Sequence, residues 1–197
     1  MVKWQKVAFK FEKQYRLKNW DYSSDGFYFI TICTKDRENY FGDIQNDKMK
    51  LSQIGMVTQK YLLQIPMHYK NILIDEFSIM PNHVHILLNN GVLSGRPMPW
   101  SSLEKSVSNS GRHMPWHVPT KNINYINTFS HPIKNSISMV INHYKSAVTK
   151  EINKSNQEFS WQTRFHDEII KNEKHYWAVK RYIKNNVINW NKDKENI

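Results

Sequence analysis

The sequence predicts an α+β fold of the ferredoxin-like type, in which a split β-α-β arrangement forms one antiparallel sheet with helices on one face. Strand and helix patterns follow one another as strand, helix, two strands, helix, strand, helix. The two adjacent strand patterns are short and separated by only two residues, as in a hairpin or meander. We expect a single domain over 1–197, because 197 residues is a usual length for one domain. A chain of this length buries roughly 70% of its unfolded surface and does not need disulfides to fold.

The strand predictions come from short apolar runs next to turn residues. The first run is aromatic and β-branched and follows Asp25-Gly26, which is typical of a turn. Pro81-Asn82 separates the second run from the third. Each run is too short for an average helix, which favours a strand. The expected strands are 27–34, 71–80, 83–90 and 165–170.

The helix predictions come from apolar residues that recur on one face. Ser52 is a good N-cap, and Pro66 stands near the end of the pattern that Ser52 opens. Ile137, Val140 and Tyr144 begin a second apolar stripe, and a third runs through the last basic segment of the chain. The expected helices are 52–66, 136–153 and 172–186.

Two segments do not fit this pattern. Residues 1–20 are basic, which is consistent either with an arm that lies on phosphates or with a solvated tail. Residues 91–133 are rich in Gly, Pro, Ser and Asn and have no clear period. We expect this segment to be a flexible loop insertion.

Composition makes nucleic acid the leading partner class. The 28 Lys and Arg exceed the 17 Asp and Glu by 11, and the chain has seven Trp, ten Tyr and nine Phe. Cations together with aromatic rings suit a polyanion with flat bases. The single cysteine, Cys33, excludes a disulfide within the chain and a zinc site made only of cysteines. Because no apolar run reaches the roughly 18–20 residues of a membrane span, we expect a soluble, cytoplasmic protein with no membrane partner.

The segment Met80-Pro81-Asn82-His83-Val84-His85 carries the clearest chemical signal. On a strand, His83 and His85 project from the same face, while Val84 points to the other side. Two imidazoles at this spacing can share a divalent ion, although a third ligand must come from elsewhere. The alternative is that both are ordinary polar residues on an exposed sheet face.

A second signal is Arg181-Tyr182-Ile183-Lys184-Asn185-Asn186. On a helix, Tyr182 and Asn186 lie one turn apart on the same face. Tyr182 is a candidate nucleophile that a metal would assist by polarising a phosphate, and Asn186 offers an oxygen ligand for Mg²⁺ or Mn²⁺. The alternative is that Tyr182 is a core aromatic residue.

Together these motifs resemble the REP-associated tyrosine transposases, within the single-tyrosine HUH (transposase IS200-like) family. The resemblance extends over nearly the whole chain outside the middle insertion. It includes Tyr28 to Thr34, Leu51-Ser52-Gln53-Ile54-Gly55, Met80 to His85, Tyr144 to Lys150, Trp161 to Asp167 and Tyr182 to Asn186.

The resemblance implies the HUH endonuclease fold and a metal-dependent transposase that nicks and rejoins single-stranded DNA at repeat hairpins without ATP. It implies that His83, His85 and Asn186 hold Mg²⁺ or Mn²⁺. It implies that Tyr182 forms a 5′-phosphotyrosine intermediate. Relatives include monomers and domain-exchanged homodimers, so the resemblance leaves the oligomeric state open. Its DNA substrate would place the protein near the nucleoid.

Several basic residues are candidates for DNA contact, although a solvated helix face is an equal alternative for Lys145 and Lys150. These candidates are Lys13, Arg16, Lys18, Lys145, Lys150, Arg164 and Lys184. Two other functions also fit the sequence. One is a catalytically inactive relative that binds hairpin DNA, and the other is a metal hydrolase for small molecules, which the charge of +11 disfavours.

Overall fold

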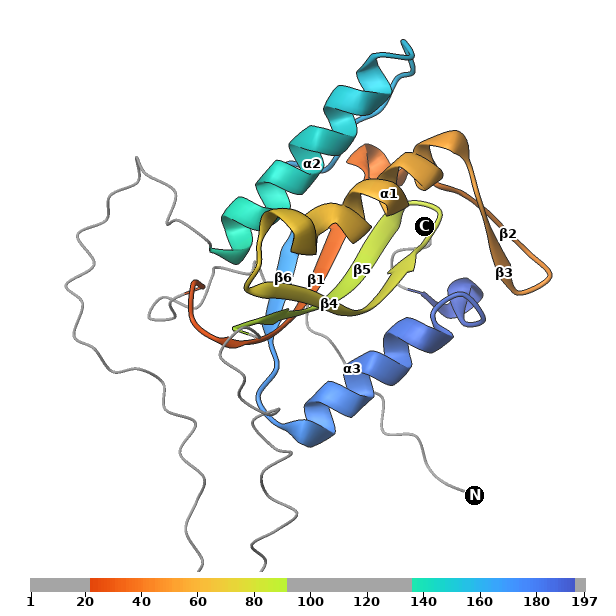
Figure 1. Ribbon diagram of the computed structural model, residues 1–197. Helices are drawn as coiled ribbons and strands as arrows, with labels where there is room; N and C mark the ends of the chain where they lie inside the picture. Colours follow the sequence, from red (N-terminus) through yellow and green to blue (C-terminus); the bar gives the residue numbers. More distant parts are fainter. Residues whose placement is uncertain (1–21, 92–135, 194–197) are drawn as a thin grey trace, which may run out of the picture.

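A computed structural model describes residues 22–91 and 136–193, and its centre is an antiparallel sheet with strand order β4-β5-β1-β6 (Figure 1). This arrangement confirms the predicted α+β fold with one antiparallel sheet. All four predicted strands are present, with ends that differ by at most one residue. They are β1 (Gly26–Cys33), β4 (Ile72–Ile79), β5 (His83–Asn90) and β6 (His166–Ile169).

The three predicted helices are also confirmed, as α1 (Gln53–His68), α2 (Ile137–Asn153) and α3 (Glu173–Asn185). Each begins at a side-chain N-cap, because Ser52, Ser136 and Asn172 accept a hydrogen bond from a backbone N–H in the first turn. Pro66 lies within the last turn of α1, which continues to His68.

The prediction of helices on one face of the sheet is wrong, because α3 covers the opposite face from α1 and α2 (Figure 1). Tyr28 and Ile30 of β1 pack in the core cluster that contains α1 and α2. Phe27 and Phe29, which alternate with them, pack in a second cluster with Val179 and other residues of α3. A central strand that is apolar on both faces requires cover on both faces.

A small hairpin was not predicted. It consists of β2 (Gly42–Gln45) and β3 (Lys48–Leu51), which pair with each other outside the main sheet. The turn residues Asn46 and Asp47 both have positive φ, at 51° and 57°. Two successive residues of this kind make the tight turn that suits a two-residue hairpin, and Asn and Asp tolerate it best among non-glycine residues.

Strand register brings the predicted histidines to the centre of the sheet. In the antiparallel pair of β1 and β5, Thr31 lies opposite His85 and Cys33 lies opposite His83. Val84 packs in the core with α1 and α2, as predicted, so both histidines project toward the face that α3 covers. They are therefore buried, at 0% and 2% exposure, and are not polar residues on an exposed sheet face.

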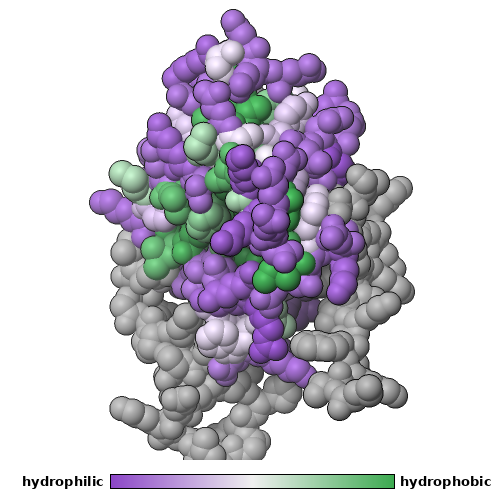
Figure 2. Space-filling view, turned by 90° about the vertical axis from the view of Figure 1, so that its right-hand side faces the viewer, coloured by the Kyte–Doolittle hydropathy of each residue, from purple (hydrophilic) through white to green (hydrophobic). Residues whose placement is uncertain are grey.

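The basic segment 1–20 and the expected loop at 92–133 lie outside the described residues. Within the described ranges, no helix is long and apolar enough to cross a membrane. Hydrophilic side chains cover most of the face shown in Figure 2, and apolar side chains gather in small groups near its middle.

Candidate functional site

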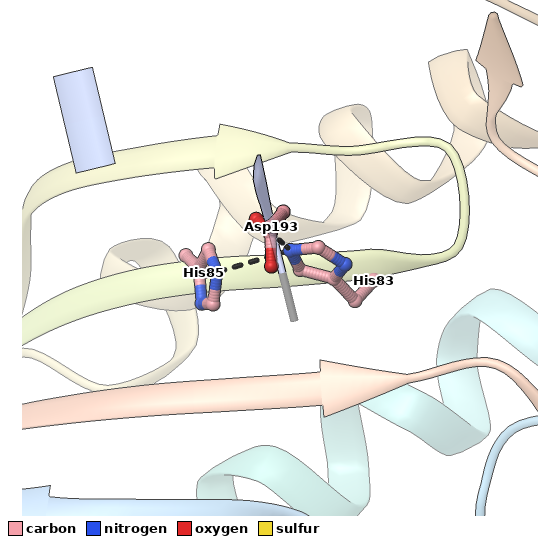
Figure 3. A group of neighbouring side chains, drawn as sticks. All are labelled: His83, His85 and Asp193. Atoms are coloured by element: carbon pink, nitrogen blue, oxygen red, sulfur yellow. Dashed lines mark hydrogen bonds and ion pairs between the residues drawn. The ribbon is translucent and has the colours of Figure 1, made fainter. Parts of the chain in front are cut away.

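The site is built around two imidazoles whose Nε2 atoms point at each other. His83 Nε2 and His85 Nε2 are 3.0 Å apart, and the ring centroids are 4.4 Å apart (Figure 3). Both side chains come from β5 and are buried between the sheet and α3. The separation fits a hydrogen bond when His85 carries its hydrogen on Nε2, whereas two nitrogens this close repel each other when both carry lone pairs. A cation held by both nitrogens removes that repulsion.

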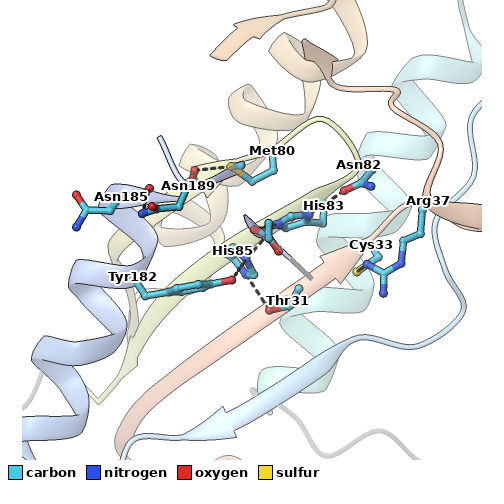
Figure 4. Close-up of polar contacts among 12 residues, drawn as sticks. Thr31, Cys33, Arg37, Met80, Asn82, His83, His85, Tyr182, Asn185 and Asn189 are labelled. Atoms are coloured by element: carbon cyan, nitrogen blue, oxygen red, sulfur yellow. Dashed lines mark hydrogen bonds and ion pairs between the residues drawn. The ribbon is translucent and has the colours of Figure 1, made fainter. Parts of the chain in front are cut away.

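The opposite ring nitrogens each have a fixed partner. His83 Nδ1 is 2.8 Å from Asn82 Oδ1, and His85 Nδ1 is 2.8 Å from Thr31 Oγ1 (Figure 4). Because an amide oxygen only accepts, His83 must donate its Nδ1 hydrogen to Asn82, which leaves Nε2 unprotonated in the neutral ring. Partners of this kind orient imidazoles for metal binding.

Asp193 adds a carboxylate to the pair. Its Oδ2 is 3.8 Å from His83 Nε2, and its side chain is only 1% exposed. Asp193 follows η3 (Trp190–Lys192), the short turn after α3. His83, His85 and Asp193 each offer a ligand atom, and these atoms lie within 4.8 Å of one another. Among the described residues, this is the one cluster of histidine, cysteine and carboxylate side chains with such a spacing.

These three donors fit a divalent cation. An octahedral ion with bonds of about 2.1 Å has neighbouring donor atoms about 3.0 Å apart (2.1 × √2). The two Nε2 atoms are separated by that distance. The carboxylate suits Mg²⁺ and Mn²⁺, whereas the imidazoles favour transition metals. The predicted role of His83 and His85 therefore fits their geometry.

Burial keeps both histidines neutral. It lowers the pKa of His83 well below its usual value, with a further contribution from the neighbouring His85. It also lowers the pKa of His85 to about 3. Neutral imidazoles are the form that binds metals, so protons do not compete for these nitrogens near pH 7.

Tyr182 projects from α3 into the same site. Its hydroxyl is 3.2 Å from His85 Nε2 (Figure 4). Its ring packs edge-on against Phe29, with the ring centroids 6.0 Å apart. The residue is 39% exposed, so a polymer in solvent can reach it. Burial of the hydroxyl, together with the charge of Asp193, raises the pKa of Tyr182 above its usual value. Tyr182 is thus a residue of the site and not a core aromatic.

The predicted metal ligand Asn186 is buried at the C-terminal end of α3. Its Nδ2 has no hydrogen-bond partner among residues 22–91 and 136–193. No hydrogen bond joins its side chain to either histidine within those ranges, whereas Asp193 Oδ2 lies 3.8 Å from His83 Nε2. A ligand role for Asn186 stays a prediction.

The predicted DNA contacts have different surroundings. Lys145 Nζ donates to the backbone oxygens of Gln162 and Thr163, at 2.6 and 3.2 Å, and burial lowers its pKa. Lys145 therefore holds the loop before β6. Lys184 is exposed on α3, and its Nζ is 3.4 Å from a carboxylate oxygen of Glu76.

The remaining candidates are exposed or lie outside the described residues. Lys150 is exposed on α2, across the sheet from the histidines, and Arg164 is exposed in the loop before β6. Lys13, Arg16 and Lys18 lie outside the described residues.

Sequence reasoning missed Asp193, Asn82, Thr31 and Arg37. Arg37 Nη1 donates to Cys33 Sγ at 2.7 Å, and its charge helps to lower the pKa of His83. Asn82 directly precedes His83, so its position next to a candidate ligand was a usable signal. Asp193 stands in a polar tail with no pattern, and nothing in the sequence marks it.

Comparison with known proteins supports this architecture. No family model matches the chain. An uncharacterized protein from Haemophilus influenzae is 32% identical over 181 residues, which cover 90% of this chain and 89% of that protein. The solved structure of a REP-associated tyrosine transposase bound to a REP hairpin is similar, with a TM-score of 0.54 and 15% identity. That match covers 92% of this chain and 76% of the transposase. The chain therefore belongs to the same family as the uncharacterized Haemophilus influenzae protein, and its fold is that of a REP-associated tyrosine transposase.

Proposed function

We propose that this protein is a metal-dependent endonuclease and strand transferase that acts on single-stranded DNA at hairpin-forming repeats. One observation carries the proposal, namely that the Tyr182 hydroxyl points at the nitrogen pair of His83 and His85. The transposase fold and the net charge of +11 support a DNA substrate. We propose Mg²⁺ or Mn²⁺ as the ion, and the two imidazole donors argue for Mn²⁺.

In the proposed reaction, Tyr182 Oη attacks a backbone phosphorus atom. The bond from Tyr182 Oη to phosphorus forms, the bond from phosphorus to the 3′ oxygen breaks, and the DNA is left with a 3′-hydroxyl. The proton of the Tyr182 hydroxyl passes to water, and water protonates the 3′ oxygen. A phosphodiester replaces a phosphodiester, so a 3′-hydroxyl can reverse the step without ATP.

The roles of the other residues follow from their positions. His83, His85 and Asp193 would hold the ion, which supplies polarisation of a phosphate oxygen and stabilisation of the leaving oxygen. Asn82 and Thr31 orient the two imidazoles. Phe29 packs against the rings of Tyr182 and His85 and keeps the two side chains together.

Covalent trapping tests this proposal. Purified protein is mixed with single-stranded hairpin oligonucleotides taken from repeats that flank its own gene, with Mg²⁺, Mn²⁺ or EDTA, and the products are separated on a denaturing gel. We expect a metal-dependent adduct that is absent in Tyr182→Phe and His83→Ala. Tyr61→Phe removes a hydroxyl from α1, on the opposite side of the sheet, and retains the adduct.

The alternative is an inactive relative that only binds hairpin DNA. Retained hairpin binding by the wild-type protein, with no adduct in any metal, would establish that alternative and exclude the enzyme. Metal-dependent hydrolysis of small phosphate esters that is indifferent to salt and to Tyr182→Phe would contradict both.

A further inference from the structure

We infer that the exposed face of α3 beside Tyr182 is a binding subsite for single-stranded DNA, with Trp177 stacked on a base and Arg181 in contact with a phosphate. The inference takes its substrate class from the proposed function. It concerns different side chains from those of the metal site. It can also be tested by binding alone, without any cleavage.

A shallow surface pocket marks this face. Its volume is about 250 Å³, and it is lined by Trp177, Lys180, Arg181, Lys184 and Asn185. These residues belong to one helix and recur at spacings of three and four, which places them on one side of α3. Val179 and Ile183 lie on the other side of the helix, where they pack against the sheet. An aromatic ring among cations is the composition that single-stranded nucleic acid sites share.

Trp177 is held in position while its ring remains accessible. The residue is 50% exposed. Its Nε1 donates to Glu173 Oε1 at 3.2 Å, and its ring meets Tyr176 edge-on at 5.1 Å. An indole fixed on one edge loses little conformational freedom when a base stacks on its open face.

One cation of the pocket is held by a carboxylate on the sheet, and the other two are more accessible to a phosphate. Lys180 Nζ is bound to both carboxylate oxygens of Asp75, each at 3.1 Å, and so ties α3 to β4. Lys184 is more accessible, because its side chain is 59% exposed and its partner Glu76 is 3.4 Å away. Arg181 is exposed and makes no hydrogen bond or ion pair with another described residue. Arg181 is therefore the cation best placed for a phosphate.

The pocket lies close to the proposed nucleophile. Arg181 directly precedes Tyr182. Trp177 is five residues before Tyr182, which is about 7.5 Å along a helix at 1.5 Å per residue. Stacked bases are about 3.4 Å apart, so that rise corresponds to about two nucleotides. Figure 4 shows Tyr182 directed toward His85 and Asn185 directed away from it. A strand joined to Tyr182 can thus run along the exposed side of the same helix.

Equilibrium binding tests the inference. All variants are made in Tyr182→Phe protein, so that no strand is cleaved, and they are titrated into a fluorescent single-stranded hairpin oligonucleotide and a blunt duplex. We expect Trp177→Ala to weaken single-strand binding about 5- to 150-fold, which corresponds to the loss of one base stack, and Trp177→Phe to restore most of the affinity. Alanine favours helix, so α3 remains folded in Trp177→Ala, as circular dichroism will show.

The charge is tested by salt dependence. Arg181→Ala should reduce the log–log salt slope of single-strand binding by about 0.7, the value for one phosphate contact. Lys60→Ala is the matched control, since it removes one exposed cation from α1, across the sheet, and should leave the slope unchanged.

Two results would overturn the inference. One is single-strand affinity of Trp177→Ala within twofold of its parent, and the other is a salt slope of Arg181→Ala equal to that of Lys60→Ala. The proposed function is tested separately, by whether the wild-type protein forms the covalent adduct.

Discussion

The Tyr182 hydroxyl lies 3.2 Å from Nε2 of His85 in the same chain. The helix that carries this tyrosine is held on the sheet of its own chain by buried apolar contacts and by hydrogen bonds from Tyr176 and Lys180 to Asp75. The proposed nucleophile and the candidate metal ligands therefore lie together within one chain.

The first prediction concerns this assembly within one chain. A mixture of Tyr182→Phe and His83→Ala proteins should form less than a few per cent of the wild-type adduct, because no chain has both parts of the site. The measurement is the covalent-trapping gel at equal total protein. Recovery to about a quarter of wild-type adduct, as expected when one mixed site forms per exchanged dimer, would contradict it.

The second prediction separates two candidates for the third ligand. Asp193→Asn should weaken Mn²⁺ binding by at least tenfold, because it removes the charge beside His83 Nε2. Asn186→Ala should change Mn²⁺ affinity less than threefold, because no hydrogen bond joins Asn186 to the histidines among the described residues. Isothermal titration with Mn²⁺ checks both variants. The opposite order of effects would assign the role to Asn186.

The third prediction concerns the partner that orients His85. Thr31→Val keeps the shape of the side chain but removes the oxygen that is 2.8 Å from His85 Nδ1. Metal affinity should fall about 10- to 100-fold. Thr58→Val is the matched control, because Thr58 is also buried and its Oγ1 has no hydrogen-bond partner among the described residues. Equal Mn²⁺ affinity in the two variants would disprove the orienting role.

The fourth prediction is a pH dependence of stability in the metal-free protein. Burial lowers the pKa of His85 to about 3 and that of His83 well below its usual value. In the unfolded chain both titrate near 6.5. Between these values the unfolded state binds more protons. The free energy of unfolding should therefore fall as pH decreases from 6.5 toward 4, by up to about 1.4 kcal/mol per pH unit for each histidine.

Urea denaturation between pH 4.5 and 7.5 measures this slope. The double variant His83→Gln, His85→Gln should have a shallower dependence, whereas replacing the exposed His68 with Gln should leave the slope as in the wild type. An unchanged slope in the double variant would show that the pair is not held neutral by the fold.

Much of the fold was predictable from local patterns. The strand and helix assignments held because each apolar run had a clear boundary, such as the Ser52 cap or the Pro81-Asn82 turn. The placement of α3 was not predicted correctly. The sequence did contain the relevant signal, because Phe27 to Ile32 is apolar at every position except Thr31, a pattern typical of a strand covered on both faces.

The sequence by itself determined the elements, the two histidines on one strand face and the tyrosine on the last helix, because periods of two and 3.6 residues are local properties of the backbone. Only the tertiary structure decided that α3 covers the histidines, that the hydroxyl of Tyr182 meets His85, and that Asp193 returns to His83. These relationships depend on packing between segments about 100 residues apart in sequence, and no local pattern encodes a contact across that separation.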